Sequence, residues 1–183
     1  MENILSILIW LPVVGMVAIA FIPREKEELI RITAAVTTGI QFLFTLLLWG
    51  DFDSKNGSMQ FREWAEWIPS FNIAYHLGVD GLSLPMVILT GMLFFIGVFV
   101  SWNIKKAVKG YFALFLMLNT GVMGVFLSLD FFLFYIFWEV MLLPMYFLIG
   151  MWGGPQREYA AIKFFIYTLA GSVLMLIAIL ALY

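Results

Sequence analysis

Long runs of apolar residues are the feature that most constrains how this chain can fold. About 20 consecutive apolar residues, coiled as an α-helix, cross the ~30 Å hydrocarbon core of a bilayer. The runs are apolar on nearly every face, whereas strands of a membrane barrel alternate in polarity. The sequence therefore predicts an all-α integral membrane protein with six transmembrane helices. We expect them at residues 4–22, 29–50, 77–101, 111–129, 131–152 and 159–183.

Composition agrees with a membrane location and excludes several classes of function. The chain is 63% hydrophobic and 12% charged, whereas soluble proteins are roughly 25% charged. Glycine-rich phosphate loops, nucleophile elbows, paired catalytic carboxylates and basic aromatic patches are absent from the sequence. There are no cysteines, which excludes cysteine-held zinc and iron–sulfur clusters. The only histidine, His76, is interpreted as a hydrated interfacial residue, so we expect no metal or cofactor in this chain.

The placement of Lys and Arg predicts the orientation of the helices. Short loops rich in these residues stay on the cytoplasmic side of a membrane. Only Lys55 and Arg62 lie in the second connection, and the fourth connection carries Asp130 alone. We therefore expect the odd-numbered connections to be cytoplasmic and the N-terminus to be outside. The other basic residues flank the first, third and fifth connections: Arg24, Lys26, Arg31, Lys105, Lys106, Lys109, Arg157 and Lys163.

The helices fall into two expected parts. Residues 1–110 hold helices one to three and a loop on the outer surface, 51–76, whose Trp64 and Trp67 suit either the membrane surface or a protein partner. Residues 111–183 hold helices four to six. Asp80 and Asp130 are expected to be helix N-caps at the outer side, because a short carboxylate accepts hydrogen bonds from the first free N–H groups of a helix.

Glu139 is the strongest candidate for a functional residue. It sits in the middle of the fifth apolar run, FFLFYIFWEVMLLPMYFLIG, with no basic residue in that run. An ionisable group at the centre of a membrane helix costs at least ~2.5 kcal/mol on insertion scales, so such groups usually serve ions, protons or charge partners. Proton transfer is the leading interpretation. The alternative is a structural glutamate locked to a polar group on a neighbouring helix.

Two tyrosines, a proline and a lysine are the further candidates for the site around Glu139. Tyr135 and Tyr146 fall on the same helix face as Glu139, where their hydroxyls are candidates to hydrogen-bond the carboxylate or hold a water. Pro144 leaves the carbonyl of Val140 without its usual helical partner and predicts a break or kink. Lys163 is a candidate relay, but it lies near the cytoplasmic end of helix six. The depth difference of ~10 Å argues against a direct salt bridge with Glu139, and snorkelling is the alternative.

Three sequence blocks carry a resemblance to a known family: YHLGVDGLSL at 75–84, FWEVMLLPMY at 137–146 and AIKFFIYT at 161–168. The chain resembles the antiporter-like proton-pumping subunits of NADH:quinone oxidoreductase (complex I), which are related to Mrp sodium/proton antiporters. The amino-acid sequences of the first two blocks are most similar to the subunit M branch, the equivalent of mitochondrial subunit 4. By this resemblance, Glu139 matches the essential helix-five glutamate and Lys163 matches a common lysine of helix six.

The resemblance implies more than this sequence contains. The family fold has about fourteen helices with two inverted repeats, so residues 1–183 correspond to its N-terminal portion, and we expect a fragment, a truncated product or one piece of a split subunit. Proton exchange would then pair Glu139 with a lysine of helix seven. NADH, flavin, iron–sulfur clusters and quinone would bind other subunits of a complex in the bacterial inner membrane. An Mrp-type sodium/proton antiporter subunit and a purely structural membrane module remain the alternatives.

Overall fold

The computed structural model describes residues 3–55, 57–69 and 73–182. Each predicted apolar run forms a helix that is long and apolar enough to cross a membrane, which confirms the all-α, six-helix membrane fold for this part of the chain. The helices are α1 (Ile4–Phe21), α2 (Glu27–Asp51), α3 (Ser83–Val100), α4 (Val108–Leu127), α5 (Phe131–Trp152) and α6 (Arg157–Leu182).

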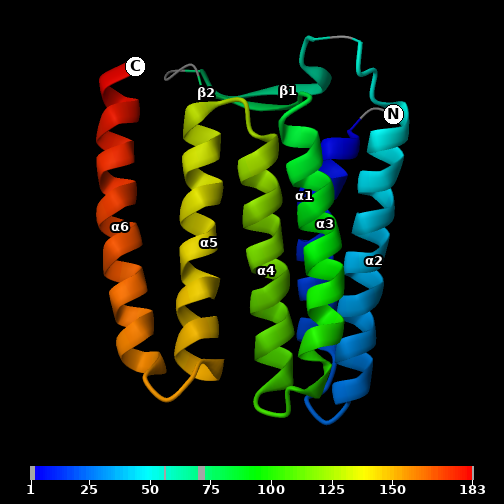
Figure 1. Cartoon of the computed structure of the whole chain (residues 1–183), viewed down its shortest axis with the longest axis vertical. Helices are drawn as coiled ribbons and strands as arrows, with labels where there is room; N and C mark the ends of the chain where they lie inside the picture. The colour runs from blue at the N-terminus through cyan, green and yellow to red at the C-terminus, as the bar shows by residue number, and fades with distance from the viewer. Residues whose placement is uncertain (1–2, 56, 70–72, 183) are drawn as a thin grey trace.

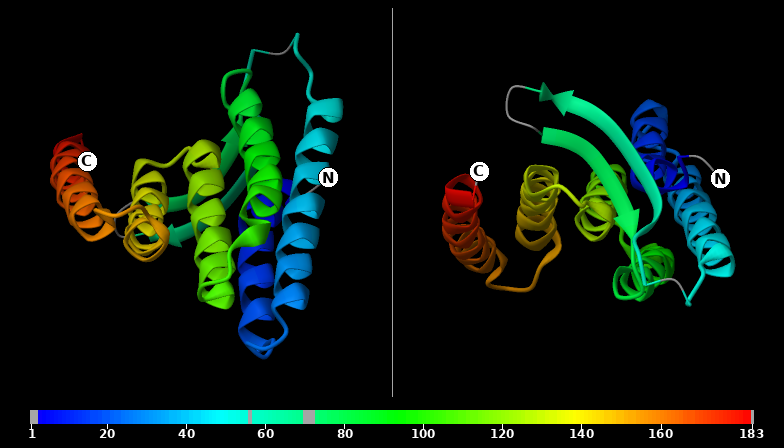
Figure 2. Two further views of the ribbon diagram at one scale, coloured as in Figure 1. Left: turned by 60° about the horizontal axis from the view of Figure 1, so that its bottom comes forward. Right: turned by 90° about the horizontal axis from the view of Figure 1, so that it is seen from above.

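The helices stand side by side, with α5 and α6 at one edge (Figure 1). Helices α1 to α4 pack into a cluster, α5 packs against α4, and α6 packs against α5 (Figure 2). The buried residues of α6 are Ala161, Ser172 and Ile179, and most of its other side chains are exposed. Helix α6 therefore presents a broad apolar surface, of the kind that lipid or further protein covers in a membrane.

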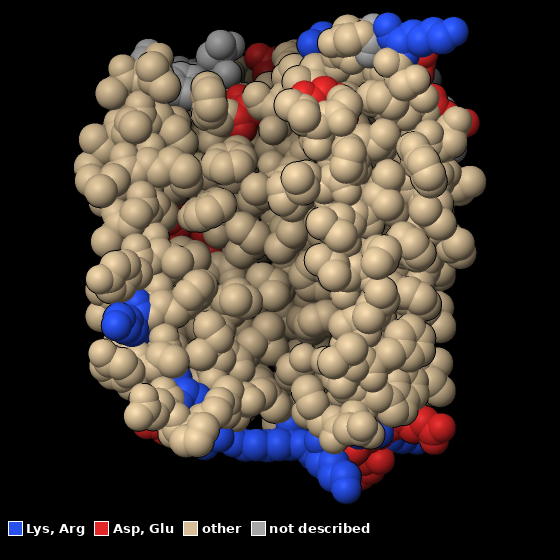
Figure 3. Space-filling view, viewed as in Figure 1, with Lys and Arg blue, Asp and Glu red and all other residues tan. Residues whose placement is uncertain are grey.

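Charged side chains gather at the two ends of the helices and leave a largely uncharged middle (Figure 3). The start of α1 and the end of α6 lie at the same end of the bundle, which we call the outer end (Figure 1). The Lys and Arg residues that flank the first, third and fifth connections lie toward the opposite, inner end. The connections rich in Lys and Arg thus lie at one end of the bundle and α1 begins at the other end. This is the arrangement that the positive-inside rule requires for an N-terminus outside the cytoplasm.

The outer segment differs from the loop expected at 51–76. Strands β1 (Gln60–Ile68) and β2 (Ile73–Val79) form an antiparallel hairpin that lies across the outer ends of α1, α4 and α5 (Figure 2). The expected start of helix three at residue 77 is also wrong, because the hairpin extends beyond that residue. Residues 77–79 pair in β2, and α3 begins only at Ser83. An apolar strand that leads into an apolar helix looks like one continuous run in a hydropathy pattern.

Of the two predicted capping aspartates, Asp130 is the N-cap of α5, whereas Asp80 lies in the turn before α3, whose N-cap position is Leu82. Asp130 Oδ1 accepts hydrogen bonds from the N–H groups of Phe132 and Leu133, at 2.8 and 3.0 Å, at the start of α5. Asp80 Oδ1 accepts from the N–H groups of Leu82 and Ser83, at 3.0 and 2.7 Å, before α3. The backbone hydrogen bond from Ser83 is the main reason why the pKa of Asp80 lies below its usual value, against the opposing effect of burial.

The hairpin is fastened to the helices at two further places. Leu129 N–H donates to the carbonyl of His76 at 2.9 Å, directly before α5 begins. At the other side, the Glu63 carboxylate of β1 accepts hydrogen bonds from Leu5 N–H at 2.7 Å and from both the N–H and the hydroxyl of Ser6. Asn3, the residue at the N-cap position, makes no side-chain capping bond. Glu63 therefore caps α1 from another part of the chain, with its charge at the favourable end of the helix dipole.

We expect replacement of Glu63 by alanine to fray the first turn of α1. The N–H groups of Leu5 and Ser6 would lose their acceptor, and loss of a capping side chain costs ~1 kcal/mol. Amide hydrogen exchange should therefore become about fivefold faster at these two residues, since ~1 kcal/mol corresponds to that factor. Glu66→Ala, on the same strand, is the control. Equal exchange rates at Leu5 and Ser6 in both variants would contradict the capping role.

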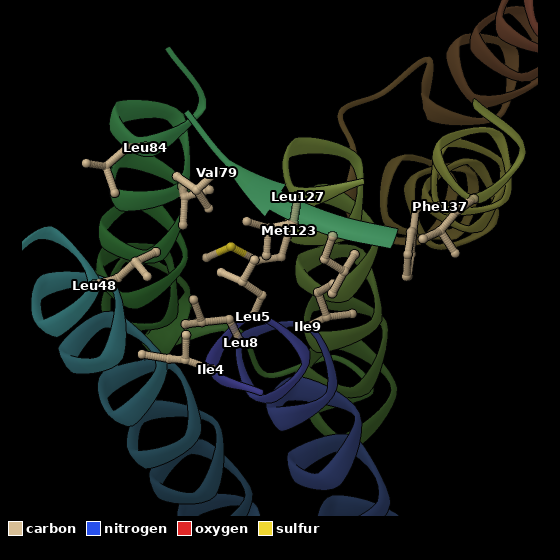
Figure 4. Close-up of a cluster of buried hydrophobic side chains, with 13 residues drawn as sticks. Ile4, Leu5, Leu8, Ile9, Leu48, Val79, Leu84, Met123, Leu127 and Phe137 are labelled. Carbon is tan, nitrogen blue, oxygen red and sulfur yellow. The ribbon is translucent and has the colours of Figure 1, made fainter. Parts of the chain in front are cut away.

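Two apolar clusters and a polar layer hold the cluster of α1 to α4 together. In the outer cluster, side chains of α1, α4 and the hairpin converge, among them Leu5, Met123 and Val79 (Figure 4). The inner cluster is centred on Phe112 of α4 and Ile30 of α2. Two buried amides are linked in series: Asn119 Nδ2 donates to Gln41 Oε1 at 2.5 Å, and Gln41 Nε2 donates to the Leu8 carbonyl at 2.8 Å. The Asn119 Oδ1 atom is buried without a hydrogen-bond partner among the described residues. This amide chain ties α4 to α2 and α1.

Candidate functional site: a buried carboxylate between two helices

Close packing of α5 on α4 positions the segment that carries Glu139. A Cβ atom added at Gly124 would lie 2.2–2.5 Å from three ring carbons of Phe137. One added at Gly121 would lie 2.5 Å from Met141 Cγ and 3.2 Å from the Phe137 carbonyl oxygen. Small residues of this kind let helix backbones approach closely in membranes. The two glycines of α4 therefore fix α5 on both sides of Glu139.

The opposite side of this segment faces α6. The ring centroids of Tyr146 and Phe165 lie 5.5 Å apart, and a Cβ atom at Gly150 would lie 3.5 Å from Ala161 Cβ. Helices α5 and α6 run antiparallel, so these contacts fix how one helix is aligned along the other. Glu139 is thereby held near the middle of a membrane-spanning pair of helices, far from both ends.

One carboxylate oxygen of Glu139 has no partner. Its Oε1 atom is buried and makes no hydrogen bond among the described residues. Tyr135 lies one helical turn earlier on α5, on the same side of the helix as Glu139. The grouping of its hydroxyl with the carboxylate stays a prediction. A buried carboxylate oxygen without a partner is unfavourable, so the site suits a further hydrogen-bond donor.

Lys163 is placed apart from Glu139. Its side chain is exposed, and its ammonium nitrogen lies 5.7 Å from the centroid of the Tyr159 ring. Within the described ranges, the salt bridge is between Arg31 and Glu27, at 3.0 Å. The carboxylate of Glu139 thus has no basic side chain paired with it in this part of the chain.

Tyr146 and Pro144 differ from what the sequence suggested. Tyr146 lies two turns beyond Glu139, and its ring packs against Phe147 and Phe165 in edge-on contacts. Pro144 is buried, but α5 continues through it without interruption, so the expected helix break is wrong. In a membrane the remaining backbone groups have no water to bond, which strongly favours keeping the helix intact around a single proline. The missing N–H at Pro144 still removes one hydrogen bond from the Val140 carbonyl.

His76 lies at the outer surface. It is partly buried in β2, where it lines a small polar hollow of about 210 Å³ together with Trp64, Glu66 and Asp130. In the described ranges, no group of three or more His, Cys, Asp or Glu residues is arranged to hold a metal ion. Among the described residues, Glu139 is the acidic residue in the middle of a membrane-spanning helix, which makes its carboxylate the candidate for chemistry there.

Comparisons with known proteins connect this geometry to a family. Residues 128–183, which include Glu139 and Lys163, match the transmembrane family model of NADH:quinone oxidoreductase and Mrp antiporters. The chain is 43% identical over 190 residues to NADH-quinone oxidoreductase subunit M of Rhodobacter capsulatus, covering 100% of this chain and 36% of that protein. It is 44% identical to NADH-ubiquinone oxidoreductase chain 4 of Arabidopsis thaliana, covering 96% of this chain and 36% of that protein.

Solved structures agree with these relatives. The chain aligns with a chain of respiratory complex I from Thermus thermophilus with a TM-score of 0.81 and 26% identity, over 96% of this chain and 35% of that one. A membrane-bound sulfane sulfur reductase from an archaeal respiratory complex has the same TM-score, 0.81, at 18% identity over 96% of this chain and 36% of that one, and so shares the fold. The chain spans little more than a third of the length of the relatives it matches. In sequence and in membrane fold, the chain is similar to part of subunit M, or chain 4, of the NADH-quinone oxidoreductases.

Proposed function

We propose that this chain is part of a proton-translocating membrane subunit of an NADH:quinone oxidoreductase, and that Glu139 takes up and releases the transferred proton. The observation that carries the proposal is the partly buried Glu139 in the middle of α5, whose Oε1 atom is buried without a hydrogen-bond partner among the described residues. Among the described acidic residues, all others lie in the hairpin, in connections or at helix ends. Glu139 is thus the group suited to carry a proton through the apolar layer.

The energetics of a buried carboxyl support proton transfer. An ionisable group at the centre of a membrane helix is costly, so such groups usually serve protons, ions or charge partners. An ammonium group that comes within ~4–6 Å of a carboxylate favours its ionised form, and withdrawal of that group favours proton uptake. The motion of one basic group toward or away from Glu139 therefore converts movement elsewhere into proton uptake and release.

The basic partner belongs outside the residues described here. Lys163 is exposed and stacked on Tyr159, a position from which it serves at most as a distant relay through water. By the family resemblance, the partner is a lysine of the following helix. That helix would pack on the broad apolar surface that α6 leaves uncovered.

The chemistry that powers translocation is assigned to other subunits. NADH oxidation and quinone reduction need flavin and iron–sulfur centres, and this chain has no cysteine to hold a cluster. We assign it no redox site and no cofactor, and expect it to act only within the complex, as a component of a translocase. Its partners would be neighbouring antiporter-like membrane subunits in the bacterial inner membrane.

An Mrp-type sodium/proton antiporter subunit is the second candidate, because the matched family model spans both groups. The two functions differ in their energy source. A complex I subunit moves protons when NADH is oxidised, whereas an antiporter exchanges sodium for protons along an existing gradient. A purely structural role predicts neither movement.

Sealed inside-out vesicles from cells with and without the gene for this chain distinguish these functions. We expect NADH to acidify the vesicle lumen in sodium-free buffer only when the chain is present. Artificial NADH oxidation that bypasses quinone is the control, because it should proceed without acidification in both preparations. Sodium-dependent proton exchange without NADH would instead support the antiporter. Equal acidification with and without the chain would contradict both transport functions.

A further inference from the structure

A groove beneath the hairpin runs between α1, α4 and α5. Its volume is about 530 Å³, and Val13 of α1, Met117 of α4 and Ile136 of α5 are among the residues that line it. The hairpin crosses the outer ends of these helices and forms the outer wall of the groove (Figure 2). The three helices are long and apolar enough to span a membrane. The groove therefore lies within the membrane region, where lipid surrounds a protein.

The part of the groove that follows the helices suits a hydrocarbon chain. On α5 its lining residues extend from Leu133 to Val140, which is ~10 Å at 1.5 Å per residue. Helix α5 continues inward to Trp152, so the groove occupies the outer half of the membrane region. Thr120 is the polar aliphatic residue on the helical walls, and its hydroxyl donates to the Leu116 carbonyl at 3.3 Å. The described residues along this part thus present an apolar surface.

The outer mouth of the groove has a different chemistry. Trp10 of α1 and Trp67 of β1, each 48% exposed, line it together with Tyr75 of β2. Glu66 adds an exposed carboxylate to the same lining, and it has no ion pair within the described part of the chain. The faces of aromatic rings attract ammonium groups, and a neighbouring carboxylate strengthens this attraction. The mouth is therefore complementary to a cation and unfavourable for an anion.

Hydrogen bonds hold two of these rings in place before anything binds. The hydroxyl of Ser6 donates to the Glu63 carboxylate, and the Tyr75 hydroxyl oxygen lies 3.0 Å from Ser6 Oγ. Because the proton of Ser6 is committed to the carboxylate, Tyr75 is the donor to Ser6. The Tyr75 oxygen in turn accepts from Trp10 Nε1 at 3.2 Å. A mouth whose rings are already ordered loses less conformational entropy when a ligand binds.

We infer that the groove binds one phospholipid of the outer leaflet whose headgroup carries an ammonium group, as in phosphatidylethanolamine. One acyl chain lies in the apolar part along α4 and α5, and the ammonium group lies at the mouth beside Glu66, Trp10 and Trp67. An anionic phospholipid would fit the apolar walls equally well but would meet the carboxylate with the wrong charge. An uncharged isoprenoid chain would leave the mouth without a partner. The inference is independent of the role proposed for Glu139.

Photolabelling of the complete membrane complex tests this site. The probe is phosphatidylethanolamine with a diazirine on one acyl chain, and mass spectrometry of peptides locates the labelled residues. We expect labels on the groove segments of α1, α4 and α5. Unlabelled phosphatidylethanolamine should displace the probe at about fivefold lower concentration than phosphatidylglycerol, which has the same chains but no ammonium group. This factor is the one that a single exposed cation–π contact gives.

Two pairs of variants separate the acyl chain from the headgroup. Val13→Trp fills the groove and should lower labelling at least tenfold, whereas Val14→Trp changes a neighbouring residue, 64% exposed, that does not line it. Glu66→Gln removes the carboxylate and should reduce the preference for phosphatidylethanolamine over phosphatidylglycerol about two- to fivefold. Asp51→Asn removes an exposed charge at the outer end of α2, away from the groove, and should keep that preference.

Equal labelling in Val13→Trp and Val14→Trp would overturn the inference, as would equal displacement of the probe by the two phospholipids. Absence of label from the groove of the intact complex would also overturn it, because another subunit would then cover this surface. The displacement experiment needs only the unaltered complex, so it decides the question even where Val13→Trp fails to assemble. None of these outcomes touches the proposed role of Glu139, which Glu139→Gln tests separately.

Discussion

Replacement of Glu139 by glutamine is expected to lower NADH-driven proton translocation about 100-fold, within the range that proton-transferring side chains contribute. Glutamine has nearly the same shape and remains polar, but it cannot gain or lose a proton near neutral pH. No other described acidic residue lies in the middle of a helix, so none can take over. The rate of luminal acidification in sealed vesicles measures the loss.

Two variants make this result specific to proton transfer. Glu158→Gln removes an exposed carboxylate from the first turn of α6 and should leave translocation unchanged. Glu139→Asp keeps a titratable group that is one methylene shorter, and we expect an intermediate rate. If Glu139→Gln translocated protons as fast as the unaltered complex, the glutamate would be a structural residue.

Replacement of Gly124 by alanine is expected to destabilise the bundle and to reduce translocation, although it lies outside the proton path. The new methyl group would stand 2.2–2.5 Å from ring carbons of Phe137, which is itself buried in the outer cluster. Overpacking of this kind costs ~1–3 kcal/mol. Because Phe137 precedes Glu139 by two residues, relief of the clash moves the carboxylate. The thermal stability of the solubilised complex and its proton translocation should fall together.

Gly110→Ala on the same helix is the control. Its methyl group would meet only Trp152, at an ordinary contact distance of 3.9 Å, so stability should be maintained. Combining Gly124→Ala with Phe137→Leu removes the ring that causes the clash, and the double variant should regain part of the lost stability. If Gly124→Ala were as stable as Gly110→Ala, close packing of α4 on α5 would not be what positions Glu139.

The membrane helices could be predicted from sequence because their signal is local. A run of about 20 apolar residues has few other solutions in a bilayer, and α5 begins and ends at the residues expected, Phe131 and Trp152. The hairpin could not be found in this way. Its strands alternate weakly, and the apolar residues of β2 merge with those before α3. The pairing of β1 with β2 depends on contacts between segments, to which a hydropathy pattern is blind.

In the candidate site, too, relations within one helix could be predicted from sequence, whereas contacts with another helix could not. Glu139 and Tyr135 are one helical turn apart, so helical periodicity was enough to group them. Tyr146 shares that periodicity, yet its neighbours are the rings of Phe147 and Phe165, because α6 covers it. The roles assigned to Glu139 and Lys163 stay predictions until they are measured.

The central claim, that Glu139 changes its protonation state while the complex works, can be measured directly. Infrared difference spectra recorded as NADH is added to the complete complex should contain a protonated-carboxyl band that changes in amplitude during turnover. We predict that this band is absent from Glu139→Gln and retained in Glu158→Gln. A turnover spectrum that is the same in Glu139→Gln and in the unaltered complex would show that Glu139 keeps one protonation state, and would contradict the proposed mechanism.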